Sequence, residues 1–255
     1  MAHRTDFKEH DIYLHLNKSP KFFLQPRDIV KAEGIFEEYN DRFIDLIKHD
    51  DIGINYSDRK LAQLSPEEME KLEKNELFIE IKDKLKDFSG IVSKNGSADR
   101  LRVNVYHPGL GFNAHSDYSK TEHYFFFEGE TYKNNTGKDW VEPETSAITA
   151  AVCFGSRRTV IFKPDKKHGT ILRSRFEGKI RPSDSIDLDL KGGDFYAFSR
   201  GFRFSEEGKL MIKGVNSTHT HCVVANSEST KDTQGDEIHV SLVMFGCQSV
   251  EDFEN

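Results

Sequence analysis

The chain has 255 residues, a formal net charge of −7 and 36% hydrophobic residues, which is enough apolar material for one large domain or two small ones. No apolar run is long enough to cross a bilayer, and the first residues lack the apolar stretch of a secretory signal. We therefore expect a cytoplasmic or nuclear protein with no membrane partner. Its three cysteines are widely spaced and odd in number, which excludes a disulfide framework and a cysteine-rich zinc site.

Residues 1–99 carry a helical pattern. Apolar side chains recur mostly at three- and four-residue steps over residues 29–47, and Pro26 is suited to the first turn of a helix there. Residues 65–68, Ser-Pro-Glu-Glu, combine a capping serine, a proline for the first turn and the glutamate of a capping box. This second helix is expected to run, with an interruption, toward Asp87. Amphipathic spacing leaves open whether the region forms a lid, covers the other half or mediates dimers, so the oligomeric state stays open.

Short strands dominate after residue 100. Six segments are rich in β-branched or aromatic residues and are bounded by turn-forming or charged residues, which is typical of strands. They are LRVNVY (101–106), AITAAVCF (147–154), RTVIFK (158–163), GDFYAFS (193–199), THTHCVVA (218–225) and IHVSLVMF (238–245). Helices followed by strands predict an α+β protein, and many short strands favour a sandwich or jelly roll. We expect the helical residues 1–99 to pack on the strand-rich residues 100–255 as part of one domain.

A histidine and an aspartate stand two residues apart in the stretch NVYHPGLGFNAHSD, residues 104–117. In a strand, positions i and i+2 face the same side, so the side chains of His115 and Asp117 would lie together. They are two of the three ligands of the 2-His-1-carboxylate triad, which leaves open positions on Fe(II). The third ligand would come from THTHCVVA, which offers His219 and His221 on one face. The alternative is a surface turn in which Asp117 is a cap.

The same stretch contains Asn-x-Tyr, then Pro-Gly, then His-x-Asp. Downstream follow CFGSRRTVIFK, GGDFYAFSRG and the terminal IHVSLVMF. In these motifs the chain resembles the AlkB family of Fe(II)- and 2-oxoglutarate-dependent dioxygenases over about residues 100–246. The resemblance implies a double-stranded β-helix, or jelly roll, with the N-terminal helices packed on it. It also implies O2-dependent hydroxylation or demethylation, in that family of a methylated nucleobase.

The resemblance further implies two sets of site residues. The iron ligands would be His115, Asp117 and His221. His221 is preferred to His219 because a Cys-Val pair follows it, as a small apolar segment follows the ligand in the family. The residues that would bind the 2-oxoglutarate cosubstrate are Asn104, Tyr106, Arg158, His239 and Ser241. Asn104 and Tyr106 alternate along a strand, so both side chains would face the same side.

The terminal strand departs from the family pattern. That pattern reads Arg-x-Asn/Ser-x-Thr-Phe-Arg, and its first arginine binds the far carboxylate of 2-oxoglutarate through charge-assisted hydrogen bonds. Here His239 and Phe245 replace the two arginines. Three explanations stay open: Arg157 or Arg158, and less readily Lys163, supplies the charge; the cosubstrate differs or binds weakly; or the site has lost activity and kept the fold. The intact iron set favours retained catalysis.

Substrate contacts and partners are expected outside the iron motifs. Residues 118–146 and 199–216 lengthen the chain beside the expected site. Aromatic residues in the first of these segments could stack a base, although most of them are better explained by a strand or hairpin that packs on the barrel; they are Tyr124, Phe125, Phe126, Phe127 and Trp140. Residues 157–182 hold nine lysines and arginines against two acids, which predicts a phosphate-binding surface for a nucleic acid or simply a solvated hairpin. The alternatives to nucleobase oxidation are hydroxylation of a protein or small molecule, and a catalytically silent jelly roll that binds a ligand.

Overall fold

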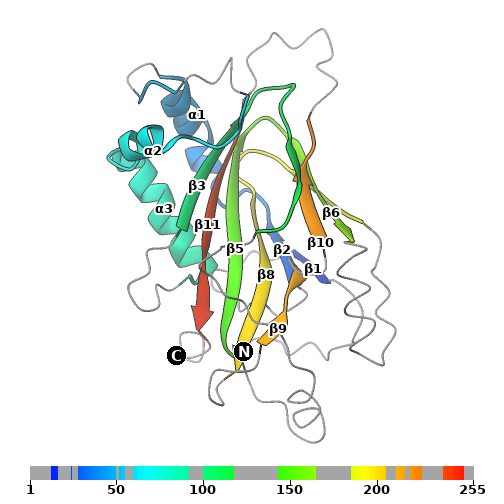
Figure 1. The fold of residues 1–255 in the computed structure, drawn as a ribbon. Coiled ribbons are helices and arrows are strands. Elements are labelled where there is room, and N and C mark those ends of the chain that lie inside the picture. The colour runs from blue at the N-terminus through cyan, green and yellow to red at the C-terminus, as the bar shows by residue number, and fades with distance from the viewer. Residues whose placement is uncertain are drawn as a thin grey trace, which may run out of the picture.

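The computed structural model describes residues 13–16, 24, 28–49, 52–54, 60–91, 100–117, 143–164, 185–204, 211–215, 219–225 and 238–249. These residues form helices and strands in the order shown in Figure 1. The helical elements are η1 (Glu37–Tyr39), α1 (Asn40–Lys48), α2 (Pro66–Leu72) and α3 (Glu76–Ser89). The strands are β1 (Tyr13–Leu16), β2 (Asp28–Ala32), β3 (Arg100–Tyr106), β4 (Phe112–His115), β5 (Pro143–Gly155), β6 (Arg158–Pro164), β7 (Ile186–Leu190), β8 (Phe195–Phe204), β9 (Met211–Lys213), β10 (His219–Val223) and β11 (His239–Ser249).

The strands form two sheets. The larger has the order β1-β2-β8-β5-β11-β3, with β9 paired to β8, and the smaller has the order β4-β10-β6-β7. Of the strand pairs described, β1–β2 is parallel and the others are antiparallel. Side chains of both sheets meet in one buried cluster, in which the rings of Phe162 and Phe198 lie 5.1 Å apart, edge to face. The predicted α+β jelly roll is confirmed, as are all six strands predicted from sequence.

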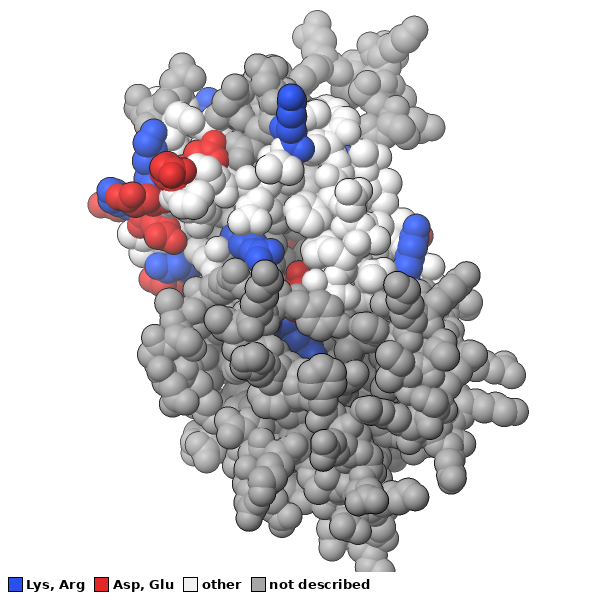
Figure 2. Space-filling model, viewed as in Figure 1, with Lys and Arg blue, Asp and Glu red and all other residues white. Residues whose placement is uncertain are grey.

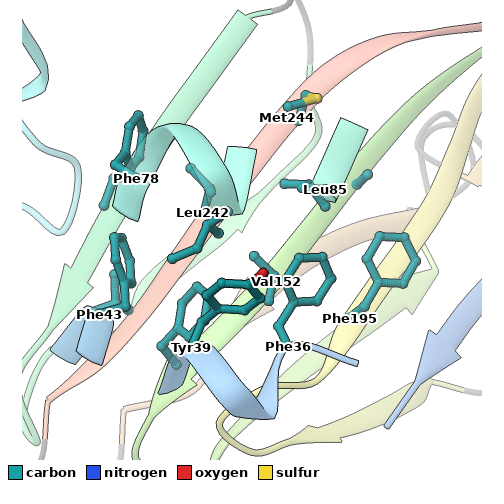
Figure 3. Packing of buried hydrophobic residues seen from close by; sticks show 14 of the residues in the cluster. Phe36, Tyr39, Phe43, Phe78, Leu85, Val152, Phe195, Leu242 and Met244 are labelled. Atoms are coloured by element: carbon teal, nitrogen blue, oxygen red, sulfur yellow. The ribbon is translucent and has the colours of Figure 1, made fainter. Parts of the chain in front are cut away.

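Helices α1 and α3 cover the outer face of the larger sheet (Figure 1). Aromatic rings fill the space between them: Phe43 lies 4.7 Å from Phe154, and Phe88 lies 4.8 Å from Phe195 (Figure 3 shows the cluster). Full burial of one such side chain stabilises the fold by roughly 1.5–3 kcal/mol. This layer closes one face of the sheet, so that the opposite face is the one directed at the smaller sheet.

The predicted start of the second helix is confirmed. The Ser65 hydroxyl accepts a hydrogen bond from the Glu68 amide at 3.2 Å, and the Glu68 carboxylate accepts one from the Ser65 amide at 2.7 Å. The expected interruption falls between α2 and α3, where the Asn75 side chain accepts hydrogen bonds from the amides of Leu77 and Phe78. A new cap therefore begins a second helix instead of extending the first. Within the described residues, no helix combines the length and apolar character that a membrane crossing requires.

The helix predicted over residues 29–47 is wrong in its first part, because residues 28–32 form strand β2. Ile29 packs between the two sheets, whereas Val30 and Ala32 pack on the helix side of the larger sheet. Burial on alternate faces is strand behaviour, and it is enforced by antiparallel pairing of β2 with β8, in which Ile29 lies opposite Phe198. Residues 1–99 therefore contribute strands to the larger sheet as well as helices.

Candidate metal centre

Strand β3 carries two different faces. Val103 and Val105 are fully buried in the cluster beneath the helices. Arg102, Asn104 and Tyr106 alternate with them and line a cavity between the two sheets. The space-filling view shows a hollow near the centre of the molecule, with acidic atoms inside it and basic atoms beside it (Figure 2). The alternation of the sequence thus directs three polar side chains toward the smaller sheet.

A tight turn then carries the chain from β3 to β4 in the other sheet. The Leu110 amide donates to the His107 carbonyl at 2.9 Å, which closes the turn at Pro108-Gly109. Gly111 follows, where a Cβ atom would meet the Val223 carbonyl oxygen at 2.6 Å. Only glycine allows this close approach to the end of β10. The turn therefore delivers β4 alongside β10.

Three side chains converge here: His115 at the end of β4, Asp117 two residues beyond it, and His221 on β10. In the pairing of β4 with β10, His115 lies directly opposite His221, and their ring centroids are 4.3 Å apart. Asp117 Oδ1 lies 3.5 Å from His115 Nε2, and Asp117 Oδ2 lies 3.7 Å from His221 Nε2. One donor atom from each residue lies within 4.8 Å of the others. The structure therefore brings together the three side chains that the sequence predicts as iron ligands.

Asp117 is a carboxylate at neutral pH. Its side chain is only 5% exposed, and burial alone would raise its pKa. The neighbouring imidazoles of His115 and His221, together with a 3.0 Å hydrogen bond donated by the Thr149 hydroxyl, lower the pKa of Asp117 to about 2. A buried carboxylate held in this way is suited to a cation, which neutralises its charge.

Both imidazoles are arranged to offer a lone pair. Burial lowers the pKa of His221 to about 4, so this ring is neutral near pH 7. His115 Nδ1 lies 2.8 Å from the Asn113 carbonyl and donates to it in the neutral ring, which leaves the Nε2 lone pair facing Asp117. Burial lowers the pKa of His115, but its contacts with Asp117 and with the Asn113 carbonyl together raise it, so that the pKa lies above its ordinary value. The donor set of two imidazoles and one carboxylate fits a transition-metal ion with open positions.

His219 lies outside this group. It is buried two positions before His221 on β10, and its backbone carbonyl accepts a hydrogen bond from the Ser116 hydroxyl at 3.5 Å. The cluster of potential metal-binding side chains found among the described residues includes His221 and not His219. The preference for His221 drawn from the Cys-Val pair agrees with this placement.

The residues predicted to bind the cosubstrate lie on the opposite wall of the cavity. Asn104 is paired across the sheet with Ser241, and its amide donates to the Ser241 hydroxyl at 3.3 Å. Tyr106 is paired with His239, and their ring centroids are 5.7 Å apart. All four line the same cavity as the three potential metal ligands. Polar groups from β3 and β11 thus face the donors from β4 and β10.

His239 does not supply the charge of the arginine that it replaces. It is buried, and burial lowers its pKa to about 4, so the ring is neutral at physiological pH. Its Nδ1 atom lies 2.7 Å from the Ser156 carbonyl and donates to it. The remaining nitrogen of a neutral imidazole is then an acceptor, which disfavours contact with a carboxylate.

Arg158 is buried behind the cavity wall, close to Tyr106 and His239, and is not among the residues that line the cavity. Its Nη2 donates to the His107 carbonyl at 2.8 Å, and its Nη1 lies 3.3 Å from the carbonyls of Pro108 and Val224. These bonds tie the β3–β4 turn to the end of β10. The buried Nε has no hydrogen-bond partner among the described residues, and the charge acts on both Tyr106 and His239. Arg158 therefore positions the two ligand-bearing strands and retains one donor.

The other proposed sources of charge differ from Arg158. Arg157 is 74% exposed and forms an ion pair with Asp189. Lys163 is exposed on the smaller sheet. Neither residue lines the cavity, and neither does Arg158, which differs from them in being buried.

Several cavity residues were not predicted from the sequence. Thr149 binds Asp117, and Cys153, Tyr196, Phe245 and Arg102 also line the cavity. Alternation along β5 marks Thr149 and Cys153 as sharing a face, but it does not say that this face meets the metal ligands. The predicted aromatic loop 118–142 and residues 165–184 of the basic segment lie outside the described residues.

The chain was compared with known proteins. No protein-family model matches it, and no curated protein matches it. Among solved structures it is similar to a Pseudomonas putida prolyl-4-hydroxylase, with 10% identity over 86% of this chain and 91% of that chain and a TM-score of 0.39. It is also similar to OsALKBH1, with 12% identity over 88% and 99% of the two chains and a TM-score of 0.35. EvdO2 from Micromonospora carbonacea var. aurantiaca, complexed with 2-oxoglutarate, gives 10% identity over 74% and 69% and a TM-score of 0.34. Because these values are low, the function of the chain is argued from its own residues.

Proposed function

We propose that this protein is an Fe(II)- and 2-oxoglutarate-dependent dioxygenase. The observation that carries the proposal is the convergence of His115, Asp117 and His221, from two distant segments, on one cavity between the sheets. The two imidazoles, His115 in its deprotonated form, and the carboxylate would hold Fe(II) and leave positions for a 2-oxo acid and O2. The bound iron, cosubstrate and O2 supply the oxidation chemistry, while the protein supplies binding, orientation and shielding.

The surrounding residues have distinct tasks in this proposal. Thr149 and the Asn113 carbonyl fix the orientation of Asp117 and His115, which pre-organises the ligands before iron binds. Asn104, Tyr106 and Ser241 present hydrogen-bonding groups on the facing wall, where they would bind the cosubstrate. Burial between the sheets keeps bulk water from this wall, which strengthens each polar contact.

Arg158 is the proposed partner of the far carboxylate of 2-oxoglutarate. Its Nε is buried, and its charge lies close to Tyr106 and His239, at the start of β11, where the AlkB pattern has an arginine. A charge-assisted bond from a guanidinium is roughly twice as strong as one between neutral groups. The guanidinium would come from β6 in this chain instead of from the terminal strand.

A methylated nucleobase in a nucleic acid is the proposed substrate class. The Asn-x-Tyr, Pro-Gly and His-x-Asp order supports it, as does the excess of basic residues in 157–182. Arg157 and Arg158 already have partners within the fold, so phosphate contacts would come from the remaining basic residues of this segment. Affinity for a methylated oligonucleotide should fall steeply with salt; an affinity that salt does not change would favour a protein or small-molecule substrate instead.

Metal binding and turnover test the enzyme directly. Under anaerobic equilibrium dialysis, the protein should bind one Fe(II) per chain, and Asp117→Ala should weaken this binding by at least about 100-fold, as expected when a ligand is lost. His219→Ala is the matched control and should bind iron normally. The iron-loaded protein should then convert 2-oxoglutarate to succinate in the presence of O2. Iron binding without succinate above a metal-free sample would favour the silent jelly roll.

A further inference from the structure

Arg102 has a position in the cavity that the proposed function does not yet use. It stands two residues before Asn104 on β3, lies on the same face and lines the same cavity as the three potential metal ligands. Its side chain is half-buried, and its guanidinium carbon lies 5.0 Å from the centre of the Phe245 ring. Arg102 is the one arginine among the residues that line this cavity.

The Phe245 ring is a rigid support for that guanidinium. Phe245 is only 8% exposed, and a second arginine, Arg200, has its guanidinium carbon 5.6 Å from the same ring centre. Arg200 is committed to the backbone, since it donates to the carbonyls of Ile148 and Gly246 at 3.2 Å. A guanidinium that lies over an aromatic face keeps its N–H groups directed outward at its edge, where they can bind a carboxylate with two parallel hydrogen bonds.

This support lies at the metal-ligand end of the cavity. Phe245 is paired across the sheet with Thr149, whose hydroxyl binds Asp117. Tyr106, at the other end, is four residues from Arg102 along one strand, or about 13 Å at the usual rise of a strand. Arg102 therefore lies at the opposite end of the cavity from Tyr106 and His239, the two lining residues that Arg158 approaches from behind.

We infer that Arg102, seated on Phe245, forms a carboxylate-binding subsite at the metal end of the cavity. Phe245 occupies the position at which the AlkB pattern has its second arginine, and the guanidinium above its ring comes from the neighbouring strand β3. The inference rests on the proposed function and names the anion that the site accepts. The carboxylate belongs either to the near end of the 2-oxo acid or to the substrate.

Binding to the Mn(II)-loaded protein separates these two sources. Isothermal titration with 2-oxoglutarate and with 2-oxobutanoate, which lacks the far carboxylate, is compared for the unchanged protein and for Arg102→Gln. An equal rise of about tenfold or more in both dissociation constants would assign the near carboxylate of the oxo acid. Arg158→Gln is the matched contrast, because it should weaken 2-oxoglutarate and leave 2-oxobutanoate nearly unchanged.

A second titration addresses the substrate. Acetate is added to the complex with Mn(II) and 2-oxoglutarate, and its binding is followed by the electron paramagnetic resonance of Mn(II). Loss of acetate binding in Arg102→Gln, with both oxo acids unaffected, would assign the subsite to a substrate carboxylate. If Arg102→Gln changes neither titration, the inference is overturned.

Two further comparisons keep the test decisive. Phe245→Leu removes the support, so it should weaken the same ligand as Arg102→Gln, and the double variant should be no weaker than Arg102→Gln alone. Should the unchanged protein bind neither Mn(II) nor 2-oxoglutarate, the proposed function fails.

The subsite is then tested by titrating the metal-free protein with acetate and following the arginine side-chain nitrogens by NMR. Chemical-shift changes that occur in the unchanged protein and not in Arg102→Gln would support the subsite. The absence of such changes would overturn it.

Discussion

The two faces of the larger sheet are built from the same strands and differ in almost every property. The outer face is apolar and packs under the helices; its buried side chains include Val152, Leu242 and Met244 (Figure 3). On the inner face, the neighbouring positions Cys153 and Ser241 line the cavity. Substitutions on one face can therefore leave the strands in place, so residues that stabilise the fold can be tested separately from residues that bind the metal or cosubstrate.

The largest stability loss is expected on the outer face. Phe43→Ala removes a fully buried ring that contacts both Phe154 and Phe78, and it should lower the free energy of unfolding by about 3–5 kcal/mol. The measurement is urea denaturation followed by circular dichroism. Phe43→Leu should lose much less. Below the unfolding transition, Phe43→Ala should keep its affinity for Fe(II); a strong loss of affinity would show that the two faces are coupled.

On the inner face, the next effect falls on metal affinity. Thr149→Val keeps the volume of the side chain but removes the hydroxyl that donates to Asp117 at 3.0 Å. Loss of such a supporting bond should weaken Fe(II) binding by roughly 10- to 100-fold. Thr149→Ser retains the donor and should bind iron like the unchanged protein. Equal affinities in the valine and serine variants would exclude a positioning role for Thr149.

His239 makes the inner face sensitive to acid. Its pKa is lowered by burial to about 4, below the ordinary value of 6.5, so at intermediate pH the unfolded chain binds a proton that the folded chain does not. Stability should therefore be fully present above pH 6.5 and be lost as the pH falls toward 4.

The variant His239→Asn isolates this contribution. Its amide can still donate to the Ser156 carbonyl but does not titrate. Near pH 5, its stability should depend on pH less steeply than that of the unchanged protein, by about 1 kcal/mol per pH unit. The unfolding free energy is measured by urea denaturation at several pH values. An unchanged slope would mean that His239 is not buried as a neutral ring.

Local patterns predicted much of the fold and the candidate metal ligands. The capping box at Ser65 and Glu68 depends on neighbours in sequence, and six strands follow from short runs of β-branched residues. His115 and Asp117 were predicted from the i, i+2 spacing of a strand; in the structure β4 ends at His115, and Asp117 still lies beside it in the segment that follows. Residues 28–32 were mistaken for a helix, because the apolar spacing around Ile29 suits both elements and pairing with β8 decides between them.

The missed residues depend on which strands are neighbours. Thr149 reaches Asp117 only because β5 of the larger sheet faces the segment that follows β4, and Arg102 reaches Phe245 only because β3 pairs with β11. Neither pairing can be derived from spacing along the chain. Arg158 was considered as a source of charge, but its bonds to the His107 and Pro108 carbonyls depend on the same long-range arrangement.

The smallest expected effect tests whether α2 can open without α3 and the sheet beneath it. Ser65→Ala removes the acceptor for the Glu68 amide and breaks the capping box of α2, while α3 keeps its own cap at Asn75. The free energy of unfolding should fall by about 0.5–1 kcal/mol, since one exposed helix end loses its side-chain partner. Ser65→Thr keeps the hydroxyl, and its free energy of unfolding should be close to that of the unchanged protein in the same urea titration.

Amide hydrogen exchange in Ser65→Ala should accelerate in α2 and not in α3 or β11. The reason is that α2 contributes only Leu72 to the fully buried core, whereas α3 contributes several apolar side chains. Faster exchange spread evenly over α3 and β11 would show that the cap supports the whole outer layer and not α2 alone.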